Sequence, residues 1–298
     1  MKKTVCGTLL LLLGIQLIQA EMEQSGMAFL KLPYSAQTAA TASVFAQKGN
    51  SPLSLFENPI GIHSEQALLS FSHHFWFADV KANALAVSFP VKTASFGLGM
   101  TYVQIPEVEI RDTPSDEPAA RVEPQYFSCA AGYHQNILKK LDAGVTLKYL
   151  YEHLYTYTSY GLAVDLAGRW RAPSLLDLTL VLQNFGTLSA DPSENRLPTT
   201  LTIGIVRPEL FVGNSFNGSL GLNLGTNLIS GSTKAQVGAE VCYQNVLTLR
   251  GGFEQTTNVN RGAVGFGLRV NKFSLDYAFL LMPEGFNSPH IITLTYIP

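Results

Sequence analysis

TSYGLAVDLAGRW, residues 158–170, alternates between two chemical kinds of side chain. One set is large and apolar or aromatic: Tyr160, Leu162, Val164, Leu166 and Trp170. The other set is small, polar or charged: Ser159, Gly161, Ala163, Asp165, Ala167 and Arg169. Successive side chains of a β-strand point to opposite faces, so this period of two predicts a strand with one apolar face and one polar face.

The same alternation recurs over about ten residues in segments 142–155, 218–228 and 234–244. A strand of this length crosses a bilayer at a tilt, whereas soluble sandwiches use strands of ~5–6 residues. The polar faces are rich in Gly, Ser, Thr and Asn with charges of both signs, which suits the lumen of a barrel. The repeated pattern therefore indicates a transmembrane antiparallel β-barrel.

Segments with this pattern number about 14, an even number, as expected of a single-chain bacterial barrel. The strands are expected near residues 67–77, 80–90, 94–103, 125–135, 142–155, 158–170, 175–184, 200–207, 217–228, 234–244, 246–255, 262–270, 273–281 and 290–297. With both termini in the periplasm, the tight turns are periplasmic: 91–93, 245 and 271–272. The longer loops are then extracellular: 104–124, 186–199, 256–261 and 282–289.

The composition is unusual for a soluble protein, since only 14% of the residues are charged against a usual ~25%. Beyond residue 20 no stretch approaches about 18 consecutive apolar residues, so no transmembrane helix is predicted. The 22 acidic residues outnumber the 20 basic ones, and a nucleic-acid partner would need a basic face. We therefore expect no nucleic-acid partner.

The first residues have the three-part layout of a secretory signal peptide. The chain begins with MKK, continues with an apolar run to Ile18 and then reaches a small residue, Ala20. The apolar run is shorter than the roughly 20 residues that a helix needs to cross a ~30 Å hydrocarbon core. We therefore expect residues 1–20 to be a cleaved signal peptide.

Residues 21–66 do not fit a barrel strand. The segment 35–45, SAQTAATASVF, is Ala-rich and predicts a short helix with Ser35 as its N-cap. Pro52 and Pro59 then break the chain. Because a lumen of roughly 14 strands is too wide for wall side chains alone to fill, we expect a small N-terminal helical plug inside the barrel. The predicted all-β architecture has three parts: signal peptide 1–20, plug or hatch 21–66 and transmembrane β-barrel 67–298.

Both ends of the chain resemble a known family of barrels. The residues that carry the resemblance are MAFLK at 27–31, SAQTAA at 35–40, FENPIGI at 56–62, LDYAF at 275–279, Gly285 and HIITL at 290–294. They resemble the PorV/PorQ-type outer-membrane proteins, including their uncharacterised treponemal relatives, which are distantly similar to the FadL long-chain fatty-acid transporters. The resemblance implies a barrel of about 14 strands with an N-terminal hatch.

No recognisable catalytic motif is present: the chain has no Gly-rich phosphate loop after a strand, no His-x-x-x-His zinc pair and no Ser-centred nucleophile elbow. His73 and His74 are adjacent, but neighbouring strand residues point to opposite faces and cannot chelate one metal ion. We therefore predict no enzyme activity, no metal and no cofactor. Cys129 and Cys242 are predicted to face lipid and lumen respectively, and so to remain free thiols.

Charged residues on the lumen side of the strands have two interpretations. By their place in the alternation they are Lys148, Glu152, Asp165, Arg169, Asp177, Glu240, Arg250, Glu254, Arg269 and Asp276. One interpretation is a selectivity or ligand-headgroup site. The other, which we favour, is a network of cross-strand ion pairs between wall and plug, because opposite charges on one sheet face are ordinary stabilisers.

The similarity to FadL implies a passage or binding site for hydrophobic small molecules, such as long-chain fatty acids, in the outer membrane of a bacterial cell. Apolar plug residues would otherwise form an exposed patch, so we expect them to line a ligand pocket together with one wall residue. These candidates are Phe29, Leu30, Phe45, Leu53, Leu55, Phe56 and the wall residue Leu150. The candidate hatch turn consists of Asn58, Pro59 and Gly61.

The expected partners are outer-membrane lipid and a hydrophobic small-molecule ligand. Two alternatives remain open at this stage. One is a protein-interaction role, as in PorV-like components of a secretion system, which would add a secretion-system partner. The other is a surface antigen without a transport role.

Overall fold

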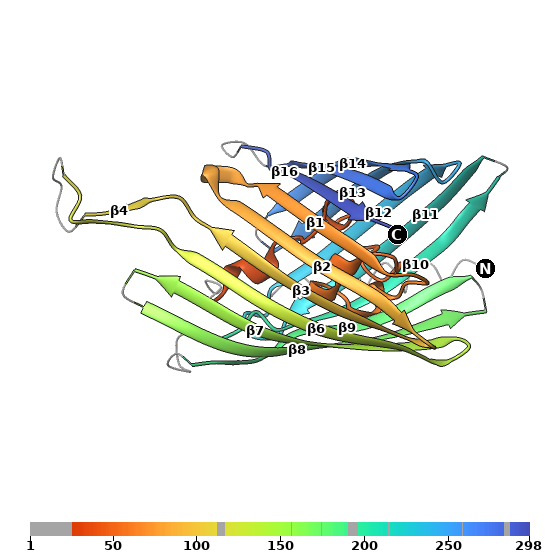
Figure 1. The fold of residues 1–298 in the computed structure, drawn as a ribbon, viewed down its shortest axis with the longest axis horizontal. Coiled ribbons are helices and arrows are strands. Elements are labelled where there is room, and N and C mark those ends of the chain that lie inside the picture. The colour runs from red at the N-terminus through yellow and green to blue at the C-terminus, as the bar shows by residue number, and fades with distance from the viewer. Residues whose placement is uncertain are drawn as a thin grey trace, which may run out of the picture.

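Across the described residues of this computed structural model, fourteen antiparallel strands close into a barrel (Figure 1). The structure describes residues 26–111, 117–155, 157–173, 175–189, 196–213, 215–257, 259–282 and 287–298. The predicted signal peptide, residues 1–20, lies outside the described residues.

The wall strands follow one another in chain order, and β1 closes the barrel by pairing with β16. Their bounds are β1 Leu68–Phe75, β2 Lys81–Val91, β3 Ala94–Gln104, β6 Gln125–Leu138, β7 Leu141–Leu154, β8 Tyr157–Ala172, β9 Leu176–Leu188, β10 Thr200–Val212, β11 Phe216–Asn227, β12 Thr233–Tyr243, β13 Leu247–Thr256, β14 Asn260–Val270, β15 Phe273–Leu281 and β16 His290–Tyr296. Each strand that the alternation predicts overlaps one of these wall strands. The predicted all-β barrel fold is therefore confirmed.

Several strands are longer than predicted, and the two largest extensions, of β9 and β10, accompany register shifts. β10 passes its predicted end at residue 207 and includes Pro208, since the pairing with β11 shifts between Arg207 and Phe211. Proline donates no ladder hydrogen bond, so such an irregularity accommodates it. β9 similarly continues past Asn184, a residue with left-handed φ (55°), where the pairing with β8 shifts.

The loop 104–124 contains a small two-stranded sheet that the sequence pattern did not predict. It consists of β4 Val108–Ile110 and β5 Ala120–Val122. The hairpin projects beyond the end of the barrel (Figure 1). Strands of three residues are too short for alternation to be recognised, which explains why this element was missed.

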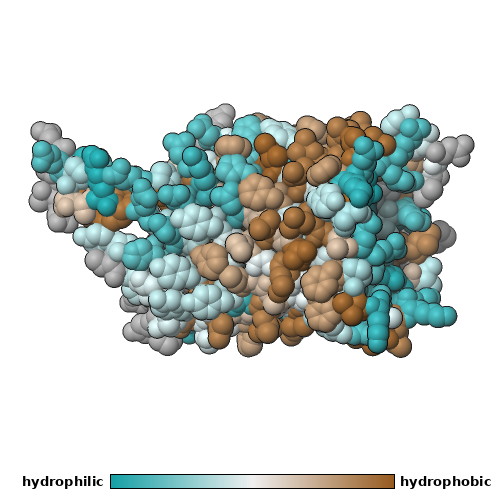
Figure 2. Space-filling view, viewed as in Figure 1, coloured by the Kyte–Doolittle hydropathy of each residue, from teal (hydrophilic) through white to brown (hydrophobic). Residues whose placement is uncertain are grey.

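The outer surface of the barrel is apolar around its middle. Large exposed side chains such as Leu147, Leu162 and Ile203 come from the outward positions of the strands. Figure 2 shows the hydrophobic residues gathered across the barrel, with hydrophilic residues at both ends. None of the helices in the described residues is long and apolar enough to cross a membrane.

Residues 26–66, which we call the N-terminal segment, lie inside the barrel (Figure 1). The segment contains η1 Ala28–Lys31, α2 Ala36–Ala40, η2 Pro52–Phe56 and η3 Pro59–Ile62, whereas η4 Phe77–Asp79 lies between β1 and β2. Ser35 caps α2 as predicted, since its hydroxyl accepts a hydrogen bond from the Thr38 amide (3.1 Å). The helix does not reach residue 45, because Ala42 and Ser43 have left-handed φ angles.

The two prolines of the N-terminal segment begin helices and do not merely break the chain. Pro52 and Pro59 are the first residues of η2 and η3. Proline suits this position because its missing N–H would have no intrahelical partner there and its φ is already close to helical values. The segment is therefore a series of short helices joined by tight turns.

Hydrogen bonds from opposite sides of the wall hold the N-terminal segment. The Ala36 amide donates to Oγ1 of Thr293 on β16 (2.8 Å). Lys148 on β7 donates from Nζ to the Phe56 carbonyl (2.9 Å). Wall glycines permit close backbone approach: a Cβ at Gly252 on β13 would lie 2.7 Å from the Ala42 nitrogen. These contacts seat the segment directly on the wall.

Candidate functional site

A cavity of about 390 Å³ lies between the N-terminal segment and the wall strands β9 to β14. Its wall residues come from the ends of these strands that are joined by the loops 189–199, 228–232 and 257–259. The loop lengths predict that this end of the barrel faces the cell exterior. The cavity volume is within the ~300–1,000 Å³ typical of small-molecule pockets.

The two sides of the cavity differ in chemistry. The N-terminal segment contributes all of its apolar lining through Leu30, Leu32, Pro33, Tyr34 and Ala46, and it adds polar groups from Lys31, Ser43, Gln47, Glu57 and Asn58. The barrel wall contributes mainly amides, hydroxyls and charged groups. A molecule in the cavity would therefore meet apolar side chains on the N-terminal segment and mainly hydrogen-bonding groups on the wall.

One row of polar wall residues is linked into a chain of hydrogen bonds across four strands. Asn223 on β11 donates to Gln236 on β12 (3.5 Å), and Gln236 donates to Glu254 on β13 (2.6 Å). Arg261 on β14 forms an ion pair with the other oxygen of Glu254 (2.8 Å). Because the carboxylate of Glu254 already has two partners, this row forms a preorganised part of the wall.

The next row toward the loops has hydrogen-bonding groups without partners. Thr202, Gly225 and Lys234 are directly opposite one another on β10, β11 and β12. Within the described residues no carboxylate or other acceptor bonds Lys234, and the buried Thr202 hydroxyl has no hydrogen-bond partner. This row can therefore offer an ammonium and a hydroxyl to a bound molecule.

The Lys234 side chain lies across Gly225, which explains its position. A Cβ at Gly225 would lie 2.7 Å from Lys234 Cε and 2.9 Å from the Thr202 hydroxyl oxygen. The absence of a side chain on β11 thus lets the lysine extend along the wall toward Thr202. The lysine carries its charge at the cavity and not across the wall into lipid.

The N-terminal segment adds two buried polar groups at the cavity. Oε1 of Glu57 accepts hydrogen bonds from the Tyr34 amide (3.0 Å) and the Thr38 hydroxyl (2.6 Å), whereas its Oε2 has no partner among the described residues. The Gln47 side-chain nitrogen likewise has no partner within the part of the chain that the structure describes. The cavity therefore has unused acceptor as well as donor capacity.

Tyr34 forms part of the apolar side of the cavity. Its ring stacks on Phe56 with 4.9 Å between the ring centroids. Burial, with smaller effects of the Asp165 and Glu57 charges, raises the pKa of the Tyr34 phenol far above its ordinary value. Tyr34 therefore remains a neutral aromatic surface at any physiological pH.

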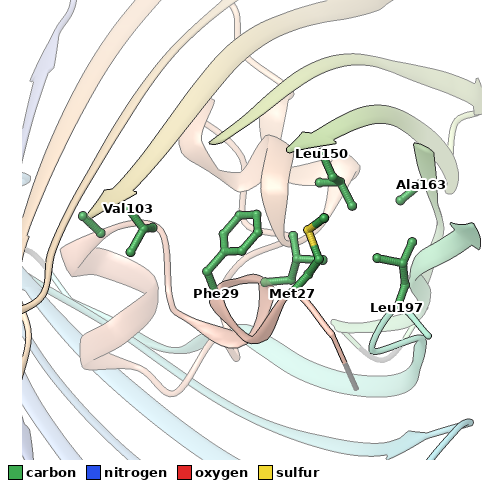
Figure 3. Close-up of a cluster of buried hydrophobic side chains, with 8 residues drawn as sticks. Met27, Phe29, Val103, Leu150, Ala163 and Leu197 are labelled. Atoms are coloured by element: carbon green, nitrogen blue, oxygen red, sulfur yellow. The ribbon is translucent and has the colours of Figure 1, made fainter. Parts of the chain in front are cut away.

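Most of the predicted ligand-lining residues pack elsewhere in the barrel. Of the seven candidates, only Leu30 lines the cavity. Phe29 and Leu150 belong to a buried cluster with Met27 and Leu197, whose side chains point toward one another (Figure 3). The cause is the dense packing between the N-terminal segment and the wall, which leaves no space beside these side chains.

The other candidates fill two further clusters. Leu53, Leu55 and Phe56 pack against small wall residues such as Ala84 and Ala86. Phe45 packs with Val44 and Val206. These residues stabilise the docking of the N-terminal segment, and the structure does not bring them to the cavity.

The candidate hatch turn is fixed by local contacts. Asn58 lines the cavity and caps η3, since its Oδ1 accepts the Ile60 amide (3.1 Å). Pro59 lies against Gly144 on β7, and a Cβ at Gly61 would overlap the carbonyl oxygen of Ala46. The turn is therefore tightly packed where it touches the wall.

Most of the predicted lumen charges form ion pairs inside the barrel. Lys148 pairs with Asp165 (2.6 Å) and Arg250 pairs with Asp276 (2.6 Å). Lys48 of the N-terminal segment pairs with Glu240 on β12. Two further pairs are Arg169 with Asp142 and Glu254 with Arg261. The remaining three predicted lumen charges differ in burial: Glu152 is buried, Asp177 is partly buried and Arg269 is exposed. The interpretation as cross-strand and wall-to-segment pairs therefore describes this set better than a headgroup site.

Lys234 is not among the ligand residues that the sequence pattern predicts. The alternation does place Lys234 on the polar face of its strand, beside Gln236 and Glu240. Nothing local distinguishes it from the lysines that have acidic partners, because the missing partner is visible only when distant strands are placed together. The one feature of the sequence that could have indicated the position of Lys234 is the glycine, Gly225, that lies opposite it on the neighbouring strand.

Metal and disulfide chemistry receive no support from the described part of the chain. The described residues contain no group of three or more His, Cys, Asp or Glu side chains that could hold a metal ion. Cys129 is exposed and Cys242 is partly buried, and both are free thiols.

No known family model and no curated protein sequence matches this chain. Among solved structures, it resembles the toluene transporter TodX of Pseudomonas putida (TM-score 0.66, 12% identity), over 88% of this chain and 97% of that one. It also resembles the toluene transporter TbuX of Ralstonia pickettii (TM-score 0.62, 11% identity), over 87% and 98% of the two chains. A third similar structure is the monoaromatic hydrocarbon channel CymD (TM-score 0.63, 10% identity, 88% and 96%).

At these identities the likeness concerns the fold. The closed barrel of this chain and its apolar outer surface are those of a bacterial outer-membrane protein. The resemblance covers the barrel and extends over nearly the whole of each similar chain.

Proposed function

We propose that this outer-membrane barrel binds and passes small molecules that have an apolar body and a polar end. The observation that carries the proposal is the cavity itself, in which apolar side chains of the N-terminal segment such as Leu30, Leu32 and Tyr34 lie across from a mainly polar wall. The structurally similar toluene and monoaromatic hydrocarbon transporters support a hydrophobic small molecule as the solute. The polar wall adds a requirement that a plain hydrocarbon would not satisfy.

Lys234 and Thr202 are the groups that we assign to the polar end of the ligand. Both lie at the cavity, and neither has a partner among the described residues. A carboxylate placed between them would accept hydrogen bonds from the ammonium and the hydroxyl. Long-chain fatty acids are therefore the ligand class that we favour, with the chain against Leu30, Leu32 and Tyr34.

The test is ligand binding by the full-length mature barrel in nanodiscs, with dodecanoate, methyl dodecanoate and toluene as probes. Lys234→Met removes the charge and keeps the length of the side chain. A hydrogen bond to a charged group contributes about 1.5–3 kcal/mol, so dodecanoate affinity should fall about 10- to 100-fold. Methyl dodecanoate should bind both forms equally.

Lys81→Met is the matched control, because Lys81 is exposed on the outside of the same end of the barrel. It should leave the affinity for all three probes unchanged. Binding of toluene without binding of dodecanoate would overturn the polar-end assignment. Absence of binding for every probe would overturn the transport proposal itself.

A second candidate function follows from the projecting hairpin β4–β5. An extended ribbon that stands clear of the barrel (Figure 1) is suited to contact a protein partner, as a PorV-like role would require. Deleting residues 107–122 and measuring co-purification with secretion components would test this role. The PorV/PorQ relationship itself rests on the residues quoted from both chain ends.

A further inference from the structure

Three lysines occupy two neighbouring tight turns at the end of the barrel opposite the cavity. Lys92 lies between β2 and β3, and Lys139 and Lys140 lie between β6 and β7. The turns are side by side, because β3 pairs with β6 and the Asn136 amide donates to the Thr93 carbonyl (3.3 Å). We call Lys92, Lys139, Lys140 and their apolar neighbours the basic patch.

The charges of the basic patch are uncompensated. All three lysines are exposed, and none forms an ion pair within the described residues. Neither turn contains an acidic residue. The adjoining Arg171 does not add to the charge, because it pairs with the buried Asp142 (2.9 Å).

Apolar side chains at the strand ends next to these turns are exposed. Val91, Ile137 and Leu138 are 44%, 55% and 65% exposed. Side chains of this size that precede lysines at a water-exposed rim would be unfavourable in water alone. They are favourable where the turn reaches the boundary between hydrocarbon and headgroups.

An aromatic cluster marks that boundary just above the two turns. Phe89 stacks with Phe96 (5.9 Å between ring centroids), and Phe96 meets Tyr133 edge-on (5.1 Å). These rings belong to β2, β3 and β6, the strands that lead into the patch. Aromatic rings gather at the membrane interface, and Figure 2 shows hydrophilic side chains at this end beyond the hydrophobic middle. The basic patch is therefore at headgroup depth and continuous with the lipid-facing surface.

We propose that the basic patch binds the headgroups of anionic phospholipids in the leaflet around the tight-turn end. Three ammonium groups complement a phosphodiester, and the exposed apolar side chains contact the acyl chains. Lysine side chains can hold their apolar stems along such a surface with the charge in the headgroup layer. This proposal does not depend on the ligand of the cavity.

Native mass spectrometry of the full-length mature barrel with added lipid tests the proposal. The probes are phosphatidylglycerol and phosphatidylcholine with identical acyl chains. The wild-type protein should retain phosphatidylglycerol in preference to phosphatidylcholine. Each lysine near an anionic surface should contribute about a fivefold increase in binding, so a Lys92→Gln/Lys139→Gln/Lys140→Gln variant should lose on the order of 100-fold.

Three controls keep the result interpretable. Lys272→Gln removes an exposed lysine from a tight turn elsewhere on the same rim, outside the basic patch, and should leave the preference for phosphatidylglycerol unchanged. The corresponding triple arginine variant should retain the preference, because it keeps the charges. Heat-modifiable mobility on gels reports that each variant is folded.

Three outcomes would overturn the proposal. One is equal retention of the two lipids by the wild-type protein. Another is an unchanged preference in the folded triple glutamine variant. The third is displacement of phosphatidylglycerol by equimolar glycerol phosphate, which would identify a site for free phosphate and not for lipid.

Discussion

A glycine on one strand determines where the charged side chain opposite it on the neighbouring strand lies. Lys234 extends along the wall only because Gly225 has no side chain. The resulting ammonium is next to a hydroxyl that also lacks a partner, Thr202. A site built in this way depends on backbone position as much as on the charged residue.

We predict that Gly225→Ala weakens dodecanoate binding although it leaves the lysine in place. The new methyl group would displace Lys234 from the cavity wall, at a cost of about 1 kcal/mol or roughly fivefold in affinity. Gly168→Ala is the control, since a Cβ there would meet nothing within 4 Å. Titration of both variants in nanodiscs measures the difference. Equal affinities in the two variants would contradict this account of Lys234.

His63 makes the docking of the N-terminal segment dependent on pH. Burial lowers the pKa of His63 below its ordinary 6.5, and the nearby His134 and Arg169 lower it further, whereas Asp142 opposes the shift. The docked segment therefore favours the neutral ring. When the segment is released, His63 regains its ordinary pKa and binds a proton more readily.

Docking should accordingly be at full strength above about pH 6.5 and weaken as the pH falls through that value. Hydrogen exchange of residues 26–66, compared at about pH 7.5 and about pH 5.5 after correction for intrinsic rates, measures the effect. His63→Gln cannot titrate and should reduce the difference. If the variant shows the same difference as the wild-type protein, another group is responsible.

At the scale of elements, the loops distinguish the two ends of the barrel. The hairpin β4–β5 extends from one end, where the 11 residues between β9 and β10 also join their strands, whereas Asn271 and Lys272 form a tight turn at the other end. Long loops are typical of the extracellular side and short turns of the periplasmic side. The cavity therefore belongs to the extracellular half under this assignment.

Epitope tags test the orientation in whole cells. Tags inserted in loop 104–124 and after Ser189 should be labelled by antibody added outside. A tag at residues 271–272 should be labelled only after the outer membrane is permeabilised. The opposite labelling pattern would reverse the barrel and the positions of both the cavity and the basic patch.

Prediction of the elements succeeded where their pattern was long. Wall strands of about ten residues give several repeats of the period of two, so each could be recognised. The hairpin β4–β5 has three residues in each strand and no such repeat. α2 ended early because Ala42 and Ser43 adopt left-handed φ, a choice imposed by the wall and not by alanine's helical propensity.

At the scale of the whole molecule, the N-terminal segment and the barrel share one core. Residues of the segment form buried clusters with wall residues on several strands. Ion pairs such as Lys48–Glu240 join the same parts. The proposed role of the segment as a plug can therefore be tested by its removal.

Deletion of residues 35–62 should leave a barrel that inserts but conducts ions freely. The deletion removes the apolar groups packed against the wall and the Phe56 carbonyl that accepts from Lys148. Dodecanoate binding should also be lost, because Ala46, Gln47 and Glu57 would no longer bound the cavity. Planar-bilayer recording measures the conductance, and heat-modifiable mobility confirms folding. Unchanged conductance together with unchanged binding would rule out a plug.

The sequence alone determined the barrel, its strands and the face that each strand turns to lipid. These properties are local, since alternation along one strand fixes which side chains point outward, and a lipid environment requires closed pairing of all strands. The tertiary structure alone decided which lumen residues pack and which remain available. Phe56 meets Ala84 and Ala86, and Lys234 meets Gly225, only because closure and register bring distant residues opposite one another. The position of the cavity depends on such contacts between residues of different strands, which the sequence of one strand does not determine.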